Sequence, residues 1–409
     1  MSYELLSKLY YKDKATFEAE YKRRKEGGYA VSLGLDIHDN EAFFVLIPEF
    51  INITTRIYKK FSRLSVLSMD VPQVAYKAYE MKCLIDEIIL SNDIEGIHST
   101  RKEVLDVLYD EKQNSRKKRF EGMILKYALL LADKPCIAPP GSSKDMRALY
   151  DEIVLDEIKE SDLPDGAIFR KDAASVVSAT QQVKHVGLMP EEKIIHYIDK
   201  TLMLLKDDDI PMICRIALLH YMVGYVHPFY DGNGRLSRFI SSSLLKEEFN
   251  SLVALRLSYT IKENQKDYYK AFDNANDPHN MGDLTPFILY FADVIEKSMD
   301  SLLERLTDGK EKLAYYNELI YQKYDGLDAR VQKKTADVLW LLVQNELFAV
   351  EPFSRKTLAK ELRVNAETAS SYVEGLVASG VPVEILKDGR KDVYKLDLMR
   401  LAEFLEKNE

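Results

Sequence analysis

The feature that most limits how this chain can fold is the stretch HPFYDGNGRLSR, from His227 to Arg238. The apolar runs on both sides, PMICRIALLHYMVGYV before it and LSRFISSSLLKEEF after it, favour helices. Proline and glycine cannot easily continue a helix, so the stretch predicts a short loop between two helices. A lone histidine before a glycine-rich turn is more often a packing or capping residue than a catalytic one. The residues around it must therefore indicate which role it has.

The residues after the histidine predict an anion site. Gly232, Asn233 and Gly234 stand where the second helix begins, and free N–H groups at a helix N terminus bind anions, above all phosphate. Arg235 and Arg238 follow three residues apart. They therefore share a helix face and can hold phosphate oxygens in a bidentate manner.

Two further side chains supply chemistry to such a site. A carboxylate beside phosphates, here Asp231, is a typical Mg²⁺ ligand. His227 can take a proton from an incoming hydroxyl near neutral pH. Together these residues predict a site for phosphoryl or nucleotidyl transfer.

The stretch matches every fixed position of HxFx(D/E)GNGRxxR and so resembles the signature of Fic-family adenylyltransferases. GAIFR, the segment after it and DLTPFILYF extend the resemblance over residues 140–300. The resemblance implies ATP and Mg²⁺ as cofactors, with these roles: general base His227, Mg²⁺ ligand Asp231, phosphate nest Gly232, Asn233 and Gly234, and partners of the β- and γ-phosphates Arg235 and Arg238.

The intact motif also implies which reaction occurs, because relatives that transfer other groups tend to depart from its GNGRxxR half. We expect AMP to pass from ATP to a Ser, Thr or Tyr hydroxyl of a protein substrate, or of the chain itself by auto-AMPylation. Removal of AMP by the same site stays open. The alternative function is a nucleotide-sensing, DNA-binding transcriptional regulator.

A second pattern, SNDIEG, spans Ser91 to Gly96 and fits the family's inhibitory pattern (S/T)xxxE(G/N). The pattern is weak alone and recurs at Ser370 to Gly375. The first match ends an apolar helix and continues as SNDIEGIHSTRKEV, which resembles the domain ahead of many Fic cores. We therefore assign Ser91, Glu95 and Gly96 to inhibition, with Glu95 pairing with Arg238 in space that the γ-phosphate needs.

Two assignments are less specific. The segment GAIFRKDAASVVSATQQVKHVGLMP breaks the helical pattern and predicts a hairpin, which the resemblance makes a target-binding flap containing Val177, Ser178, Ala179 and Val186. Tyr268 and Tyr269 are assigned to the adenine, although paired tyrosines on a helix are more often core residues.

The 409-residue chain is long for one core, and we expect a mainly α fold. An N-terminal domain (1–135), which opens with a hairpin over residues 28–48, carries the inhibitory helix. A Fic-type helical core (136–325) bears the flap. After a polar connector, LTDGKEKLAYY, three helical patterns and a hairpin at Asp388-Gly389 predict a winged helix-turn-helix domain (326–409).

Charge and hydropathy bear on partners and location. A net charge of −9 gives no bulk attraction to nucleic acid or anionic membrane. Glu367 and Glu374 on the expected recognition helix argue against strong DNA binding, although basic residues lie nearby, so DNA stays undecided and a homodimer stays open. The chain has no apolar run that could span a bilayer, and its start, MSYELLSKLYYKDK, does not resemble a secretory signal. We therefore expect a cytoplasmic protein without a membrane partner.

Overall fold

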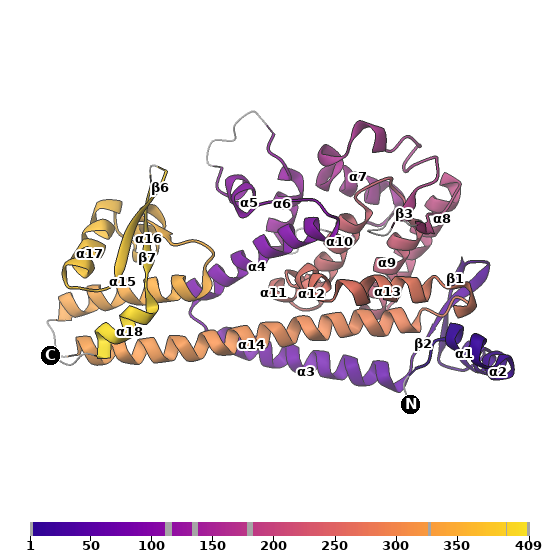
Figure 1. Ribbon diagram of the computed structural model, residues 1–409, viewed down its shortest axis with the longest axis horizontal. Coiled ribbons are helices and arrows are strands. Elements are labelled where there is room, and N and C mark those ends of the chain that lie inside the picture. The colour runs from indigo at the N-terminus through magenta and orange to yellow at the C-terminus, as the bar shows by residue number, and fades with distance from the viewer. Residues whose placement is uncertain are drawn as a thin grey trace. The chain divides into compact units, whose positions relative to one another are not determined.

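The computed structural model describes residues 3–110, 117–132, 138–177, 183–325, 329–389 and 391–406. The chain divides into two compact units, the first formed by Met1–Phe61 and Leu84–Asp300 and the second by Ser62–Cys83 and Ser301–Glu409. Helices dominate both units (Figure 1), so the expected mainly α fold is confirmed. The division into three domains at residues 135 and 325 follows motifs rather than contacts and stays a prediction.

Helices α1 to α14 follow one another along the chain, and α14 begins in the first unit and ends in the second. They are α1 (Leu6–Lys12), α2 (Lys14–Lys25), α3 (Pro48–Asp70), α4 (Gln73–Ile94), α5 (Arg101–Leu108), α6 (Glu121–Ala128), α7 (Ser143–Ile153), α8 (Glu191–Leu204), α9 (Met212–Val226), α10 (Asn233–Glu248), α11 (Ser251–Ala254), α12 (Leu257–Glu263), α13 (Gln265–Ala275) and α14 (Thr285–Tyr324). Short 3₁₀ turns join them at η1 (Leu129–Leu131), η2 (Leu155–Glu157), η3 (Glu160–Asp162) and η4 (Pro278–Asn280).

The centre of the first unit is α9, which is apolar on all sides. All but three of its fifteen residues are buried, as expected of a helix without a polar face. It packs against α8 and against α10. The loop between α9 and α10 is therefore fixed from both ends by buried helices.

Two hairpins of the first unit confirm predictions from β-branched sequence. Strands β1 (Ala30–Ile37) and β2 (Asn40–Val45) pair antiparallel within residues 28–48. Strands β3 (Ser175–Val177) and β4 (Val183–Val186) pair antiparallel in the expected flap segment. Figure 1 shows β3 near α9, and the ring of His185 on β4 stacks on Tyr225 of α9 with centroids 5.0 Å apart.

After α14, the second unit consists of helices of different lengths and one small sheet. Its remaining elements are α15 (Ala329–Phe348), β5 (Phe353–Ser354), α16 (Arg355–Leu362), α17 (Ala366–Ala378), β6 (Val383–Asp388), β7 (Lys391–Leu396) and α18 (Leu398–Glu406). The strand order is β5-β7-β6. The predicted hairpin is confirmed, with Gly389 at φ 57°; naming this region a winged helix-turn-helix domain remains an interpretation.

The expected polar connector is wrong, because LTDGKEKLAYY lies inside the 40-residue helix α14. Glycine lowers helix propensity, which made Gly309 resemble a break. Its position is explained by packing: a Cβ atom on Gly309 would stand 2.3 Å from the ring of Phe348. The glycine is where α14 and α15 approach closely, and tertiary contact outweighs propensity there.

Among the described residues, no helix is both long and apolar enough to cross a membrane.

Candidate active site

The loop between α9 and α10 begins at a strained backbone position. Pro228 cannot donate a helical hydrogen bond and disfavours helical geometry at the residue before it. His227 accordingly ends α9 in the left-handed region, with φ 52° and ψ 61°. Its N–H still donates to the carbonyl of Val223 at 3.0 Å. The histidine is thus held as the cap of a buried helix.

The imidazole of His227 is half-buried and electrically neutral near pH 7. Burial, with the nearby charges of Arg170 and His185, lowers the pKa of His227 to about 4. Nδ1 of His227 is buried and makes no hydrogen bond to a described residue that meets ordinary distance and angle limits. The backbone of Gly224 nevertheless raises the pKa of the ring slightly against the effect of burial. A neutral imidazole can accept a proton.

Asn233 fixes the shape of the loop. Its side-chain amide donates to the carbonyl of Phe229 at 2.8 Å and accepts from the N–H of the same residue at 3.0 Å. The ring of Phe229 stacks on Tyr150 of α7, with centroids 3.6 Å apart. Gly232, at φ 83°, precedes the first turn of α10. Its conformation and the close approach of Tyr150 both favour glycine.

Arg235 is a buried cation without a close partner. None of its solvent-accessible surface remains, and burial lowers the pKa of its guanidinium. Nε, Nη1 and Nη2 make no hydrogen bond within the described residues. Asp231 approaches Nη2 to 3.6 Å, beyond hydrogen-bond distance. A buried guanidinium in this state can still gain an anion as a hydrogen-bond partner.

Arg238, one turn further along α10, has a full set of partners. Its Nη1 lies 2.7 Å from Oε1 of Glu95. Nε donates to the hydroxyl of Ser91 at 3.0 Å, and Nη2 donates to the carbonyl of the same residue at 2.7 Å. The structure therefore brings together Ser91, Glu95 and Arg238, as the SNDIEG pattern predicts.

The end of α4 explains how Glu95 is placed. The helix stops at Ile94, and Gly96 adopts φ 73°, the left-handed conformation typical of helix ends. The N–H of Glu95 donates to Asn92, and that of Gly96 donates to Asp93. The carboxylate of Glu95 therefore projects from the residue just beyond the helix, and 30% of its side chain is exposed.

Sequence reasoning missed Glu87, which lies on the same face of α4 because residues 87, 91 and 95 repeat every four positions. Its buried carboxylate accepts three bonds from Ser258, two from the N–H and one from the hydroxyl at 2.6 Å. Burial raises its pKa to about 7, although those bonds and Arg238 oppose the shift. The helical spacing alone could have identified it.

Asp231 is the acidic residue of the loop. Its side chain is 46% exposed, and Oδ1 accepts from the N–H of Gly232. Within the described ranges, no three His, Cys, Asp or Glu side chains are grouped so as to hold a metal ion. A metal at Asp231 would therefore take most of its ligands from a substrate and water.

The other assigned residues are more dispersed. Tyr268 is buried, and its hydroxyl forms a hydrogen bond with Nε2 of His220 at 2.8 Å. This environment is typical of a core residue. Tyr269 is 44% exposed and donates to the carbonyl of Ile94 at 3.3 Å. Of the flap residues, Val177 lies in β3 and Val186 in β4. Ser178 and Ala179 lie outside the described residues.

The second SxxxEG match lies within α17 of the second unit. There the hydroxyl of Ser370 bonds to that of Tyr394 in the hairpin at 2.8 Å. Ser370 to Gly375 continue the helix, whereas Ser91 to Gly96 end one.

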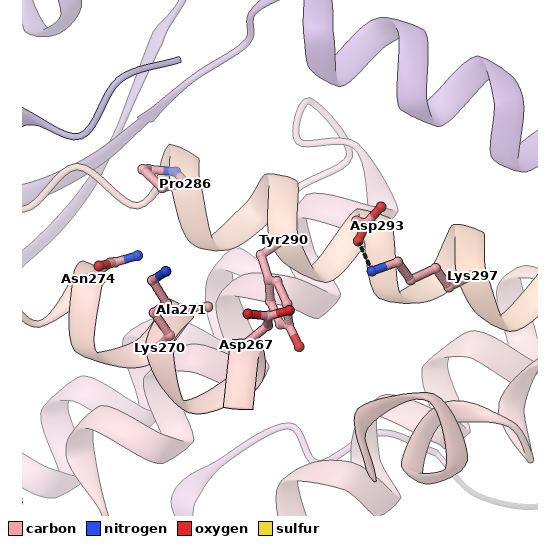
Figure 2. A pocket seen from close by; sticks show the side chains of 8 residues that line it. All are labelled: Asp267, Lys270, Ala271, Asn274, Pro286, Tyr290, Asp293 and Lys297. Carbon is pink, nitrogen blue, oxygen red and sulfur yellow. Dashed lines mark ion pairs between the residues drawn. The ribbon is translucent and has the colours of Figure 1, made fainter. Parts of the chain in front are cut away.

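A separate groove between α13 and α14 has a cavity of about 210 Å³ (Figure 2). Asp293 and Lys297 form an ion pair of 2.9 Å at one end of it. Tyr290 lies within it, and burial with the charges of Asp267 and Asp293 raises the pKa of its phenol. Its lining contains no residue assigned to the active site.

Taken with the helical fold, the loop after α9 brings a buried helix N terminus together with the buried guanidinium groups of Arg235 and Arg238, an arrangement that can bind an anion. Residues 140–245 match the family model described as the Fic/DOC family. These residues constitute a Fic domain.

Similar proteins of known sequence carry the same family name. "Protein adenylyltransferase Fic" of Drosophila mojavensis is 33% identical over 121 residues, which are 29% of this chain and 22% of that protein. Its namesake in Nematostella vectensis is 35% identical over 91 residues, which are 22% of this chain and 19% of that protein. The chain therefore spans about a fifth of the length of the curated relatives it matches.

A solved structure shares the fold over a longer range. A Fic family protein from Desulfovibrio desulfuricans G20 superposes with a TM-score of 0.52 at 17% sequence identity. The match covers 87% of this chain and 97% of that one. The similarity in fold thus extends well beyond the Fic domain.

Proposed function

We propose that this chain is a self-inhibited protein adenylyltransferase, which transfers AMP from ATP to a Ser, Thr or Tyr hydroxyl of a protein. The observation that carries the proposal is the carboxylate of Glu95, which is bonded to Arg238 beside the N terminus of α10. An anion therefore already lies where the motif residues would bind a triphosphate. The names of the two relatives support AMP transfer as the reaction.

The residues on α10 fit the phosphates of ATP. The first-turn N–H groups and the positive end of the helix dipole face an anion. The buried, unbonded guanidinium of Arg235 supplies charge that nothing else in the described structure satisfies at hydrogen-bond distance. Arg238 supplies a second guanidinium once Glu95 leaves Nη1. A bound Mg²⁺ held by Asp231 would neutralise phosphate charge during transfer.

His227 acts as the general base in this proposal, which its neutral imidazole supports. As the target hydroxyl attacks the α-phosphorus, its proton passes to the neutral imidazole, an O–P bond forms, and the bond to the bridging oxygen breaks. Pyrophosphate leaves with that electron pair. The protein contributes mainly orientation and charge stabilisation, which dominate catalysis of phosphoryl transfer.

Inhibition follows from the position of Glu95. Its carboxylate holds Nη1 of Arg238 and repels the negative charge of a γ-phosphate. ATP then binds without the geometry needed for attack at the α-phosphorus. A carboxylate can also activate water, so removal of AMP from a modified protein belongs to the proposal as a second direction of the reaction.

Label position in ATP tests the reaction. The Glu95→Gly variant, Mg²⁺ and ATP labelled at the α-phosphate are incubated with a mixed protein extract, and labelled protein is separated on a gel. We expect label on protein, including the chain itself, and none when the label is on the γ-phosphate. Label from the γ-phosphate alone would identify phosphorylation instead.

The same experiment separates the alternative function, a DNA-binding regulator that only senses nucleotide. In that case Glu95→Gly would bind ATP and ADP yet transfer no label from either position. Parallel measurement of ADP binding by calorimetry shows whether the nucleotide site is intact.

A further inference from the structure

Arg170, just before the β3–β4 hairpin, is fully buried beside the loop between α9 and α10, as Arg235 and Arg238 are. Within the described residues it has no carboxylate partner. Its guanidinium instead donates to four backbone carbonyls: His227 at 2.7 Å, Val226 at 3.3 Å, Leu188 at 3.0 Å and Asp172 at 2.5 Å. A buried cation without a counter-ion is costly, so its carbonyl partners must hold it firmly.

The four carbonyls belong to two parts of the site. Those of Val226 and His227 form the end of α9 and the strained cap that carries the base. Those of Asp172 and Leu188 flank the hairpin, one before β3 and one after β4. The planar guanidinium directs its N–H groups in a fixed fork. One side chain thus joins both ends of the hairpin to the backbone of the histidine.

Backbone contacts reinforce the same junction. The N–H of Leu188 donates to the carbonyl of Val226 at 3.1 Å, and that of Gly187 donates to Ala174 at 2.9 Å. Gly187 leaves no room for a side chain: a Cβ atom there would lie 2.3 Å from Nη2 of Arg170 and 2.8 Å from Cβ of His227. The hairpin base, the arginine and the histidine are in direct packing contact.

We propose that Arg170 is a positioning residue that fixes the flap hairpin and the His227 backbone as one rigid unit, so that a hydroxyl aligned on the flap meets the base at a constant distance. This inference rests on the proposed function. The arginine makes none of its hydrogen bonds with α10, so its loss should disturb the acceptor hydroxyl and the base and leave the nucleotide anion site intact.

The test uses the full chain in the Glu95→Gly background, with self-modification from α-labelled ATP as the activity and ADP binding as the independent readout. Arg170→Lys keeps the charge but loses the fork. Self-modification should fall by about tenfold or more, because an error of about 1 Å in position can cost a hundredfold, while the Kd of ADP changes by less than about threefold. Arg170→Met should lower transfer further.

A second variant perturbs the contact between Gly187 and Arg170 through the glycine instead of the arginine. Gly187→Ala leaves Arg170 unchanged but places a Cβ atom in its space, so it should reproduce the Arg170→Lys defect. Both variants should also speed amide hydrogen exchange at residues 187 and 188, a measurement that needs no activity. Arg147→Lys is the matched control: Arg147 also donates to a carbonyl, that of Ile168, but it is paired with Asp151, and its variant should stay within about twofold of the parent.

The outcomes are distinguishable. Absence of transfer by the Glu95→Gly parent would count against the proposed function itself. An active parent whose Arg170→Lys and Gly187→Ala variants transfer AMP equally well would overturn the role of Arg170. Parallel loss of transfer and of ADP binding would also overturn it, because the arginine would then support the whole fold.

Discussion

The carboxylate of Glu95 lies against Gly234 in the first turn of α10. A Cβ atom on that glycine would stand 2.0 Å from Oε1 of Glu95 and 3.0 Å from Nη1 of Arg238. The glycine therefore leaves space beside the helix N terminus that the carboxylate of Glu95 occupies. Any larger residue at position 234 would displace the carboxylate, but it would fill the same space itself.

Glu95→Gly should raise transfer of AMP by at least about tenfold, a change worth roughly 1.4 kcal/mol in the barrier. The variant clears the space beside Gly234 and frees Nη1 of Arg238 for the γ-phosphate. ADP has no γ-phosphate, so calorimetry should give nearly equal ADP affinities for both forms. Gly234→Ala is the contrasting variant: it should fail to activate, because its own methyl group blocks the phosphate.

Arg238→Ala tests whether Glu95 acts through that arginine. If productive placement of ATP needs Arg238, the double variant with Glu95→Gly should be as inactive as Arg238→Ala alone. A double variant as active as Glu95→Gly would show that the glutamate inhibits at some other place.

Arg235→Met should leave the free protein as stable as before or raise its stability by on the order of 1 kcal/mol, since it removes a buried cation that makes no hydrogen bond within the described residues and lies 3.6 Å from Asp231. ATP affinity should fall at the same time. Arg238→Met, on the same helix, should instead destabilise the protein, because it strips Ser91 and Glu95 of their partner. Denaturant unfolding and nucleotide titration of both variants measure the contrast; equal stability losses would contradict it.

His227→Ala should reduce transfer by about a hundredfold or more, the usual contribution of a general base, with little change in ADP affinity. Because the pKa of His227 is lowered to about 4, the ring of the free enzyme stays neutral as pH falls from 8 to 6. The kcat/KM for ATP of the Glu95→Gly variant should therefore show no decline from histidine protonation over that interval. A tenfold fall centred near pH 6.5 would contradict the lowered pKa of the imidazole.

Glu87 predicts a stability difference that depends on pH. Its folded-state pKa is raised from an ordinary 4.5 to about 7, so its contribution is fully present below pH 4.5 and is lost as pH rises to 7. The free energy of unfolding of Glu87→Gln, minus that of the wild type, should thus increase between pH 5 and 7, at most by about 1.4 kcal/mol per pH unit. Parallel curves in urea titrations would show that the carboxylate is ionised throughout.

Local patterns were enough to predict the loop and its arginines. The glycines, the proline and the spacing of Arg235 and Arg238 act within one turn of helix, where sequence and geometry are closely tied. The contact between Glu95 and Arg238 spans 143 positions of sequence, so the residue types alone could not place it; the resemblance of SNDIEG to a family pattern did.

Other features depend on distant contacts that leave no periodic signal. An arginine in a loop is ordinarily exposed, and nothing in GAIFR shows that Arg170 binds carbonyls of the α9 terminus and both ends of a hairpin. Gly309 led to a wrong prediction for the opposite reason. Its low helix propensity favoured a connector, but its close contact with the ring of Phe348 places it inside a helix.

Ser91 holds two of the three guanidinium nitrogens of Arg238, so only Nη1 has a partner to exchange. Glu95 competes for that nitrogen as a tethered ligand, and its effective concentration is set by the length and stiffness of the single helical turn that separates it from Ser91. Dilution of the protein leaves such competition unchanged. A binding event or modification that unwinds that one turn would lower the effective concentration, and with it the proposed inhibition, while the arginine keeps its place.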